Sequence, residues 1–326
     1  MATRINTKYL LDLVSRSFAL AIPLLDKNKK VKVEIQYLLA RIMDTIEDSS
    51  HTIENKETLI TGFINILKTE NTSNLENFKN IVIEKTINNN DKILIEHINV
   101  VLKVFFSLNQ YVKNISISYL REMGYGMIYY QDHNITTFED LDDYCYYVAG
   151  TVGVYLTELA KTCDNLELDK EKAKSLGRFL QKINIIKDAK TDYKEHRVFF
   201  PLSLFDNENP APYFEDASYM DKAMEVLDNM VKSTISEFKN SIEYIITIEK
   251  KAIGYRRFCL IAVLMGYETL KLIRNNYNIF MGEPVKIAKK TTLDIVTKVK
   301  ADYYTNKKLE DLLEKSFYNE ILEQKK

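Results

Sequence analysis

Proline and glycine are scarce in this chain of 326 residues, which contains only 5 Pro and 9 Gly. No proline occurs between Pro23 and Pro201. Because proline interrupts helices and both residue types mark turns, so long a gap permits many uninterrupted helices and argues against a turn-rich β protein. Apolar residues make up 46% of the chain and recur at helical spacing almost throughout, so we predict an all-α fold around a large core.

Cysteines, net charge and long apolar runs are also limited. The 3 Cys are widely spaced and the 4 His are scattered, so we predict neither a disulfide framework nor a zinc-type site, as suits a reducing cytosol. The net charge of −1 lacks the excess of positive charge that is typical of nucleic-acid-binding proteins. The longest apolar run, residues 258–267, is far too short to span a bilayer, and no signal-peptide pattern is present. We therefore expect a cytoplasmic protein whose contact with a membrane is at most peripheral, and the sequence indicates no oligomeric state.

The pattern of apolar residues predicts one helical domain over residues 1–326, with a core over about 5–280 and a lysine-rich helical segment over about 285–326. The predicted helices cover residues 9–25 (ended by Pro23), 31–50, two stretches between Lys56 and Asn88, 92–123 (ended by Gly124 and Gly126), 136–164, 170–193 and, after a loop over 206–218, 221–275. Thr137 and Asp140 have the spacing of an N-terminal capping box.

Two clusters of carboxylates lie on predicted helices. The stretch "DTIED" contains Asp44, Glu47 and Asp48, and "NIIKDAKTD" contains Asp188 and Asp192. Spacings of three and four place each cluster on one helical face, where like charges repel unless a cation lies over them. Carboxylates suit Mg²⁺, which commonly binds one or two of them together with substrate phosphate oxygens. The residues alone leave two interpretations open, a solvated helix face or a site where a metal assists ionisation of a diphosphate ester.

The helix predicted over 136–164 is apolar on nearly all sides and is therefore expected to be central. One face combines tyrosines with small residues: Tyr144, Tyr147, Val148, Thr151 and Tyr155, with Gly150 and Gly153 leaving space beside them. Aromatic faces can stabilise a carbocation through their π-quadrupoles. Close packing of helices is the other interpretation of the same residues.

Four segments together resemble the squalene/phytoene synthase family of head-to-head prenyl transferases. They are "SRSFALAIPLL", "YLLARIMDTIED", "YCYYVAGTVGVYL" and "FLQKINIIKDAKTDYKEHRVFFP", in the order of the family and over roughly the first two thirds of the chain. "FLQKINII" and "YCYYVAG" are most similar to the squalene synthase branch. The resemblance implies an all-α isoprenoid-synthase fold, a helical bundle around a central cavity with two facing aspartate-rich helices.

The resemblance also implies roles for individual residues. It implies that Asp44, Glu47, Asp48, Asp188 and Asp192 bind Mg²⁺, and that Tyr37 and Tyr144 act with these aspartates in catalysis. The implied diphosphate-binding residues are Arg16, Arg41, Arg197, Ser15, Ser17, Lys187, Gln181 and Asn184. Those implied to line the cavity are Phe18, Val148, Gly150, Gly153 and Phe258. Lys286 and Lys289 are candidates for binding the phosphate of a nucleotide cofactor, or for an ordinary solvated face.

The implied activity joins two farnesyl diphosphate molecules through presqualene diphosphate into squalene, with Mg²⁺ and NADPH as cofactors. The chain departs from the family pattern at Lys187, where Arg is usual, and at Thr191, where an acid is usual. Ala262–Val263 replaces the usual Pro-Gln, and Ala288 replaces a basic residue. The last two departures favour an alternative, an NADPH-independent synthase giving presqualene diphosphate, dehydrosqualene or phytoene. Two further alternatives are a non-catalytic assembly or scaffold relative and a terpene cyclase, and the prenyl chain length, C15 or C20, is not readable.

Overall fold

The computed structural model describes residues 5–15 and 17–315, and these residues form helices joined by short connections, with no strand among them. The α-helices are α1 (Thr7–Val14), α2 (Phe18–Ala21), α3 (Lys27–Glu47), α4 (Ile53–Thr69), α5 (Leu75–Lys85), α6 (Asn89–Glu96), α7 (Ile98–Phe106), α8 (Gln110–Asp132), α9 (Phe138–Cys145), α10 (Thr151–Asp164), α11 (Lys170–Lys194), α12 (Ala211–Glu215), α13 (Met220–Thr247), α14 (Ile253–Ile273), α15 (Asn278–Met281), α16 (Lys289–Lys300) and α17 (Asn306–Glu314). Short 3₁₀ turns are η1 (Ile22–Leu24), η3 (Leu202–Leu204), η4 (Asp206–Glu208), η5 (Ala217–Tyr219) and η6 (Lys250–Ala252), and η2 (Tyr146–Gly150) is a π-helical turn. The all-α prediction is confirmed.

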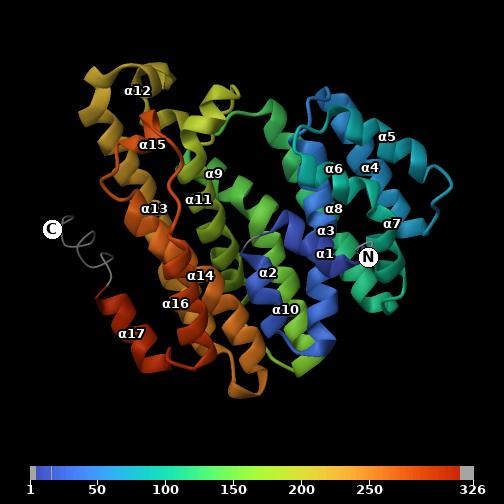
Figure 1. Cartoon of the computed structure of the whole chain (residues 1–326). Coiled ribbons are helices and arrows are strands. Elements are labelled where there is room, and N and C mark those ends of the chain that lie inside the picture. Colours follow the sequence, from blue (N-terminus) through green and yellow to red (C-terminus); the bar gives the residue numbers. More distant parts are fainter. Residues whose placement is uncertain (1–4, 16, 316–326) are drawn as a thin grey trace.

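The segment from α9 to α11 lies at the centre of the bundle. In Figure 1 it runs in green between α3–α8 on one side and α13–α17 on the other. Helix α10 packs against both α3 and α11, while α11 also packs against α13 and α14. The predicted central position of the stretch 136–164 is therefore confirmed, and α3 and α11 both pack against its helix α10.

Two predicted helices are interrupted in the structure. The stretch 9–25 breaks at Ser15, whose backbone is extended and whose Oγ accepts a hydrogen bond (3.1 Å) from the Phe18 amide at the start of α2. The prediction of one helix over 92–123 is wrong, because the chain forms α6, α7 and α8 there. Asn109 begins α8 by accepting a hydrogen bond (2.9 Å) from the Val112 amide, so a side-chain cap divides a continuous apolar pattern.

The glycines at 124 and 126 do not end a helix, since both lie inside α8. A Cβ on Gly126 would lie 2.1 Å from the Cβ of Tyr147, so this glycine lets η2 approach α8 closely. The predicted capping box at Thr137 and Asp140 is confirmed, and it begins α9. The helix predicted over 136–164 consists of α9, η2 and α10, which follow one another without a gap, with the π-helical turn η2 in the middle.

Backbone-to-backbone packing joins η2 and α10 to α11. A Cβ on Gly153 would lie 2.1 Å from the Ala173 carbonyl oxygen, and one on Gly177 would lie 2.3 Å from that of Ala149. These contacts correct the expectation that Gly150 and Gly153 line a cavity. Gly150 is also buried towards α11, 3.5 Å from the Lys174 carbonyl oxygen by the same measure, so both glycines serve helix packing instead.

Gly153→Ala is expected to lower the free energy of unfolding by about 1–3 kcal/mol, because the new methyl group meets a backbone oxygen that cannot rotate away. Gly62→Ala in α4 is the matched control, since no atom lies within 4 Å of its Cβ position. That change is expected to stabilise the chain by about 0.5–1 kcal/mol through helix propensity. Urea unfolding of both variants measures the difference, and equal stabilities would contradict the packing described.

The C-terminal part agrees with the prediction of a helical segment as far as it is described, since α16 and α17 occupy most of residues 289–314. The proline-containing stretch 206–218, predicted as a loop, contains the short turns η4, α12 and η5. Within residues 5–15 and 17–315, we find no helix of the length and apolar character that crossing a membrane requires.

Candidate active site

Helix α3 presents one accessible stripe in an otherwise buried stretch. Between residues 32 and 48, the side chains that remain accessible are Tyr37, Arg41, Asp44 and Asp48, and all others are buried. Their spacing of four, three and four residues places them on one helical face. Polar side chains that share a face in a buried helix indicate a water-accessible space beside that face. The predicted residues of the first motif thus lie together, apart from Glu47, which is buried.

Helix α11 has a matching stripe. Between Phe179 and Ala189, the accessible side chains are Leu180, Gln181, Asn184, Lys187 and Asp188, while the intervening residues are buried. The side chain of Asn184 is exposed, although α11 packs against α10, α13 and α14 on its other sides. The second motif therefore faces accessible space as the first does.

Arg197 joins the two motifs. One guanidinium nitrogen, NH1, donates to Oδ1 of Asp48 at 3.0 Å, and NH2 lies 3.9 Å from Oδ1 of Asp192. The backbone enables this contact, because His196 adopts a left-handed conformation (φ 61°) after α11 and the Arg197 amide donates back to the Asp192 carbonyl oxygen at 2.9 Å. The ends of α3 and α11 consequently meet around one guanidinium.

Arg41 is held by a residue that sequence reasoning missed. Its Nε and NH2 donate to the two carboxylate oxygens of Asp91, at 3.0 and 2.7 Å, and its NH1 lies 3.9 Å from Asp44. Asp91 lies in the first turn of α6 and is buried. No local pattern in the sequence marks it, because its partner is fifty positions earlier in the chain.

Burial raises the pKa of three carboxyl groups near these stripes. The pKa of Asp44 rises to about 7, with Arg41 opposing the rise and Asp48 adding to it. Burial and the charges of Asp48 and Asp44 raise the pKa of Glu47 to about 8. Burial, opposed by Arg197, raises the pKa of Asp192 to about 7. Ionisation of this group of acids at neutral pH is therefore unfavourable unless a cation compensates it.

The carboxylates alone do not form a complete metal-binding site. Among the described residues, no group of three or more His, Cys, Asp or Glu side chains is arranged to hold a metal ion without further ligands. Asp48 is paired with Arg197, and Asp188 accepts a hydrogen bond from Lys187. A metal bound here would need oxygen atoms from a ligand or from water to complete its coordination.

The second motif carries fewer carboxylates than the first. Lys187 donates to its neighbour Asp188, so this lysine is directed along its own helix. Thr191, where an acid was expected, is exposed. This half of the site therefore offers Asp188 and Asp192, with Glu195 just beyond the motif, where its Oε2 accepts a hydrogen bond (2.8 Å) from Arg197.

Aromatic rings lie near Arg197 and around Tyr37 of the α3 stripe. Tyr144 is buried and stacks on Phe199 at a centroid distance of 5.0 Å, and the Arg197 guanidinium lies 5.7 Å from the Phe199 ring. The ring centroids of Tyr37 and Phe18 lie 5.0 Å apart, and those of Phe18 and Phe258 lie 6.0 Å apart. Burial raises the pKa of both tyrosines, that of Tyr144 well above its ordinary value, so both phenols remain protonated at neutral pH.

The remaining predicted residues are distributed around this centre. Ser15 is buried, Ser17 precedes α2, and Val148 is an accessible residue of the π-helical turn. Arg16 lies outside the described residues. Lys286 and Lys289 are exposed before and at the start of α16.

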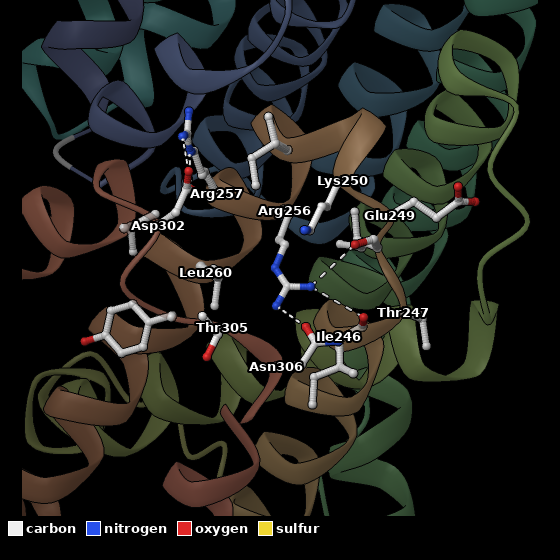
Figure 2. Close-up of a pocket in the computed structure, with 14 residues that line it drawn as sticks. Ile246, Thr247, Glu249, Lys250, Arg256, Arg257, Leu260, Asp302, Thr305 and Asn306 are labelled. Atoms are coloured by element: carbon white, nitrogen blue, oxygen red, sulfur yellow. Dashed lines mark hydrogen bonds and ion pairs between the residues drawn. The ribbon is translucent and has the colours of Figure 1, made fainter. Parts of the chain in front are cut away.

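Two pockets lie apart from the aspartate stripes. One, of about 770 Å³, lies between the α13–α14 connection and α16–α17; Figure 2 shows its Arg256 directed at the end of α13 and its Arg257 paired with Asp302. Three backbone carbonyl oxygens and Asn306 already accept from Arg256. The other, of about 480 Å³, is lined by residues at and after the end of the second motif, including Lys190, Lys194 and His196. Neither includes an aspartate of either motif.

Comparison with known proteins identifies the family. The family model described as squalene/phytoene synthase matches residues 11–291, which include both stripes and Arg197. The chain belongs to the squalene/phytoene synthase family. The resemblance stated from the four sequence segments is thereby confirmed. The roles of the individual residues in the two aspartate motifs remain predictions.

Relatives within the family include enzymes from several organisms. The chain is 31% identical to the squalene synthase of Schizosaccharomyces pombe over 88% of its own length, and 32% identical to that of Dictyostelium discoideum over 86%. It spans only 63% and 66% of the length of those two proteins, slightly less than two thirds.

Solved structures share the fold. A structure of TcSQS with the ligand E5700 superposes with a TM-score of 0.80 at 26% identity, covering 98% of both chains. A dehydrosqualene synthase in complex with a ligand gives a TM-score of 0.63 at 20% identity over 91% of this chain and 95% of the other, which is a likeness of fold alone. The isoprenoid-synthase type of helical bundle predicted from the resemblance is therefore confirmed.

Proposed function

We propose that this chain catalyses the Mg²⁺-dependent head-to-head condensation of two farnesyl diphosphate molecules to presqualene diphosphate, and its conversion to squalene with a hydride supplied by NADPH as a co-substrate. The observation that carries the proposal is the meeting of two accessible acidic stripes, one on α3 and one on α11, around Arg197. The names of the family relatives support the substrate and the product. Family membership alone would leave the chemistry open, because one fold hosts several functions.

The donor set fits Mg²⁺. Asp44 and Asp48 on α3 would supply one pair of carboxylates to Mg²⁺, and Asp188 and Asp192 on α11 a second pair, with the remaining ligands coming from diphosphate oxygens or water. Glu47 is a further predicted ligand, and its side chain is buried. The raised pKa values of Asp44 and Asp192 indicate crowded negative charge, which a divalent cation relieves. Bound there with a diphosphate, the ion would neutralise charge on the leaving group and so favour ionisation of the allylic ester.

The basic side chains of the chain complete the diphosphate site. Arg197 and Arg41 present guanidinium groups at the first motif, and Lys187 presents an ammonium group at the second. Guanidinium groups suit phosphate oxygens because they offer paired donors, whereas the lysine offers a single point of charge. We infer that diphosphate binding at α11 is less constrained in orientation than at α3.

The aromatic side chains act on the hydrocarbon part of the substrate. Tyr144, Phe199, Tyr37 and Phe18 present ring faces beside the stripes, and such faces stabilise a carbocation without capturing it covalently. The protonated phenol of Tyr144 is not a base at neutral pH, since burial raises its pKa well above the ordinary value. Its role in this proposal is to orient the cation and to exclude water.

A nucleotide site does not fit the residues predicted for it. Lys286 and Lys289 are exposed, and neither lines either of the two pockets described above. Ala262 lies accessible on α14 where the family usually has proline. We derive no reductive step through these residues. Their exposure favours a second candidate function, a synthase that makes presqualene diphosphate, dehydrosqualene or phytoene without NADPH.

The stoichiometry of diphosphate release and the dependence of the product on NADPH together distinguish the two candidates. Purified chain with farnesyl diphosphate, Mg²⁺ and NADPH should release one diphosphate for each substrate consumed if squalene forms. Arrest at presqualene diphosphate releases one for every two substrates consumed. An identical hydrocarbon product with and without NADPH would contradict the reductive step and leave the condensation intact.

The stability of the metal-free chain is expected to fall as pH rises from about 4 to about 7. The carboxyls of Asp44, Glu47 and Asp192 keep their protons in the folded chain at pH values where they ionise in the unfolded chain, so the unfolded state is favoured increasingly over this range. Excess Mg²⁺ should therefore raise the melting temperature more at pH 8, where these acids are largely ionised, than at pH 6. Thermal unfolding with and without Mg²⁺ at both pH values measures this, and an equal rise would contradict it.

A further inference from the structure

The position of Arg41 depends on a buried carboxylate outside both aspartate motifs. We propose that Asp91 is a positioning residue, which directs one guanidinium nitrogen of Arg41 towards the site and prevents Arg41 from pairing fully with Asp44. The inference rests on the proposed function, because it takes Arg41 as a ligand of diphosphate and Asp44 as a ligand of Mg²⁺.

The geometry separates the two carboxylates that compete for Arg41. Asp91 receives two hydrogen bonds from Nε and NH2, at 3.0 and 2.7 Å, which is the paired arrangement that fixes the guanidinium plane. The remaining nitrogen of Arg41, NH1, lies 3.9 Å from Oδ2 of Asp44, which is too far for a hydrogen bond. Arg41 thus contributes positive charge beside Asp44 without occupying its oxygen atoms.

Burial makes this arrangement specific. The side chain of Asp91 is 7% exposed, against 28% for Arg41 and 33% for Asp44. A buried carboxylate is costly without its partner, so Asp91 holds Arg41 strongly. Helix α6, which carries Asp91, packs directly against α3, and Asn88 caps its first turn through the amide of Asp91 itself.

Loss of the Asp91 charge would change the pairing on α3. Arg41 and Asp44 are three residues apart on one helix, a spacing at which oppositely charged side chains pair readily. Released from Asp91, the guanidinium would turn to Asp44 and compete with a metal ion for the same oxygen atoms. A purely structural role for the Asp91–Arg41 pair would instead stabilise the contact between α6 and α3 and leave the ligand affinity of the folded chain unchanged.

Calorimetric titration of the purified full chain with inorganic pyrophosphate in excess Mg²⁺ separates these roles. Asp91→Asn, which keeps the shape of the side chain, is expected to weaken binding by about tenfold, as is typical when a residue that orients a metal-site ligand is replaced. In an Arg41→Gln background, Asp91→Asn should weaken binding no further, because the two residues act as one unit.

Asp302→Asn is the matched control. Asp302 accepts the same pair of hydrogen bonds from Arg257, at 3.0 and 2.8 Å, at a pocket whose lining includes no aspartate of either motif (Figure 2). Its loss removes an ion pair of the same geometry at a more exposed aspartate, and the affinity for Mg²⁺–pyrophosphate should stay at the wild-type value.

Each outcome decides the proposal. A folded Asp91→Asn variant that binds as tightly as wild type would overturn the role of Asp91 and leave the proposed function standing. Absence of binding by the wild-type chain would contradict the proposed function itself. If Asp91→Asn does not fold, Asp91→Glu replaces it: its longer side chain displaces the guanidinium, binding should weaken at least threefold, and unchanged affinity would overturn the proposal.

Discussion

Replacing Asp44 with asparagine is expected to lower turnover of farnesyl diphosphate about 10³-fold, on the order of 4 kcal/mol of transition-state stabilisation. Asp44 lies at the middle of the accessible stripe of α3, where it would hold Mg²⁺ against the leaving diphosphate. Asparagine keeps the size of the side chain but removes its charge, so the affinity for the ion is lost and the fold is kept. Steady-state kinetics with saturating Mg²⁺ gives the measurement.

The same substitution is expected to raise the stability of the metal-free chain at pH 8. Burial raises the pKa of Asp44 to about 7, so at pH 8 the folded state carries an unfavourable ionised carboxylate that asparagine lacks. Activity and stability therefore change in opposite directions, which is typical of a strained functional site.

Asp12→Asn on α1 serves as the control for Asp44→Asn. Asp12 forms an exposed ion pair with Lys8 at 2.6 Å. The loss of this pair should change neither the turnover of farnesyl diphosphate nor the stability of the chain measurably. A variant at Asp44 with full activity would contradict the catalytic interpretation and favour the non-catalytic scaffold alternative. Loss of both activity and stability would indicate that Asp44 serves the fold.

Arg197→Gln is expected to lower kcat/KM about 10²-fold, because it removes a charged hydrogen-bond donor from the junction of the two motifs. Without a ligand, the Arg197 guanidinium also donates a hydrogen bond (3.0 Å) to Oδ1 of Asp48 and so occupies one of its carboxylate oxygens. Its removal should therefore strengthen the binding of Mg²⁺ alone while it weakens the binding of pyrophosphate.

Titration of Arg197→Gln with Mg²⁺ alone, and with pyrophosphate at saturating Mg²⁺, tests these opposite effects. Arg257→Gln, which loses a comparable aspartate partner at the pocket in Figure 2, should leave both affinities unchanged. A parallel loss of both affinities in Arg197→Gln would contradict a role in neutralising the two motifs and would point to a collapse of the turn after α11.

The acidic half of the site was predictable because its information is local. The spacing of Asp44 and Asp48, and of Asp188 and Asp192, follows from helical periodicity, and the accessible stripes on α3 and α11 agree with it. Glu47 shows the limit of that argument: by spacing it shares the face of Asp44 and Asp48, yet its side chain is buried.

Features that depend on long-range contacts were not predictable. Asp91 pairs with a residue fifty positions earlier, and the sequence around it resembles an ordinary polar helix start. Gly153 was expected beside a cavity, but the identity of the helix that packs on it, α11, is a tertiary property. The break between α7 and α8 within residues 92–123 depended on Asn109, a single capping residue within an apolar pattern, which favours a turn only where the tertiary structure uses it.

The mass of the product made from farnesyl diphosphate by the purified chain with Mg²⁺ and NADPH tests the central claim most directly. The claim predicts a C30 compound joined head to head, squalene or presqualene diphosphate, that disappears when Mg²⁺ is chelated. A cyclic C15 product, or consumption of substrate that chelation leaves unchanged, would contradict it.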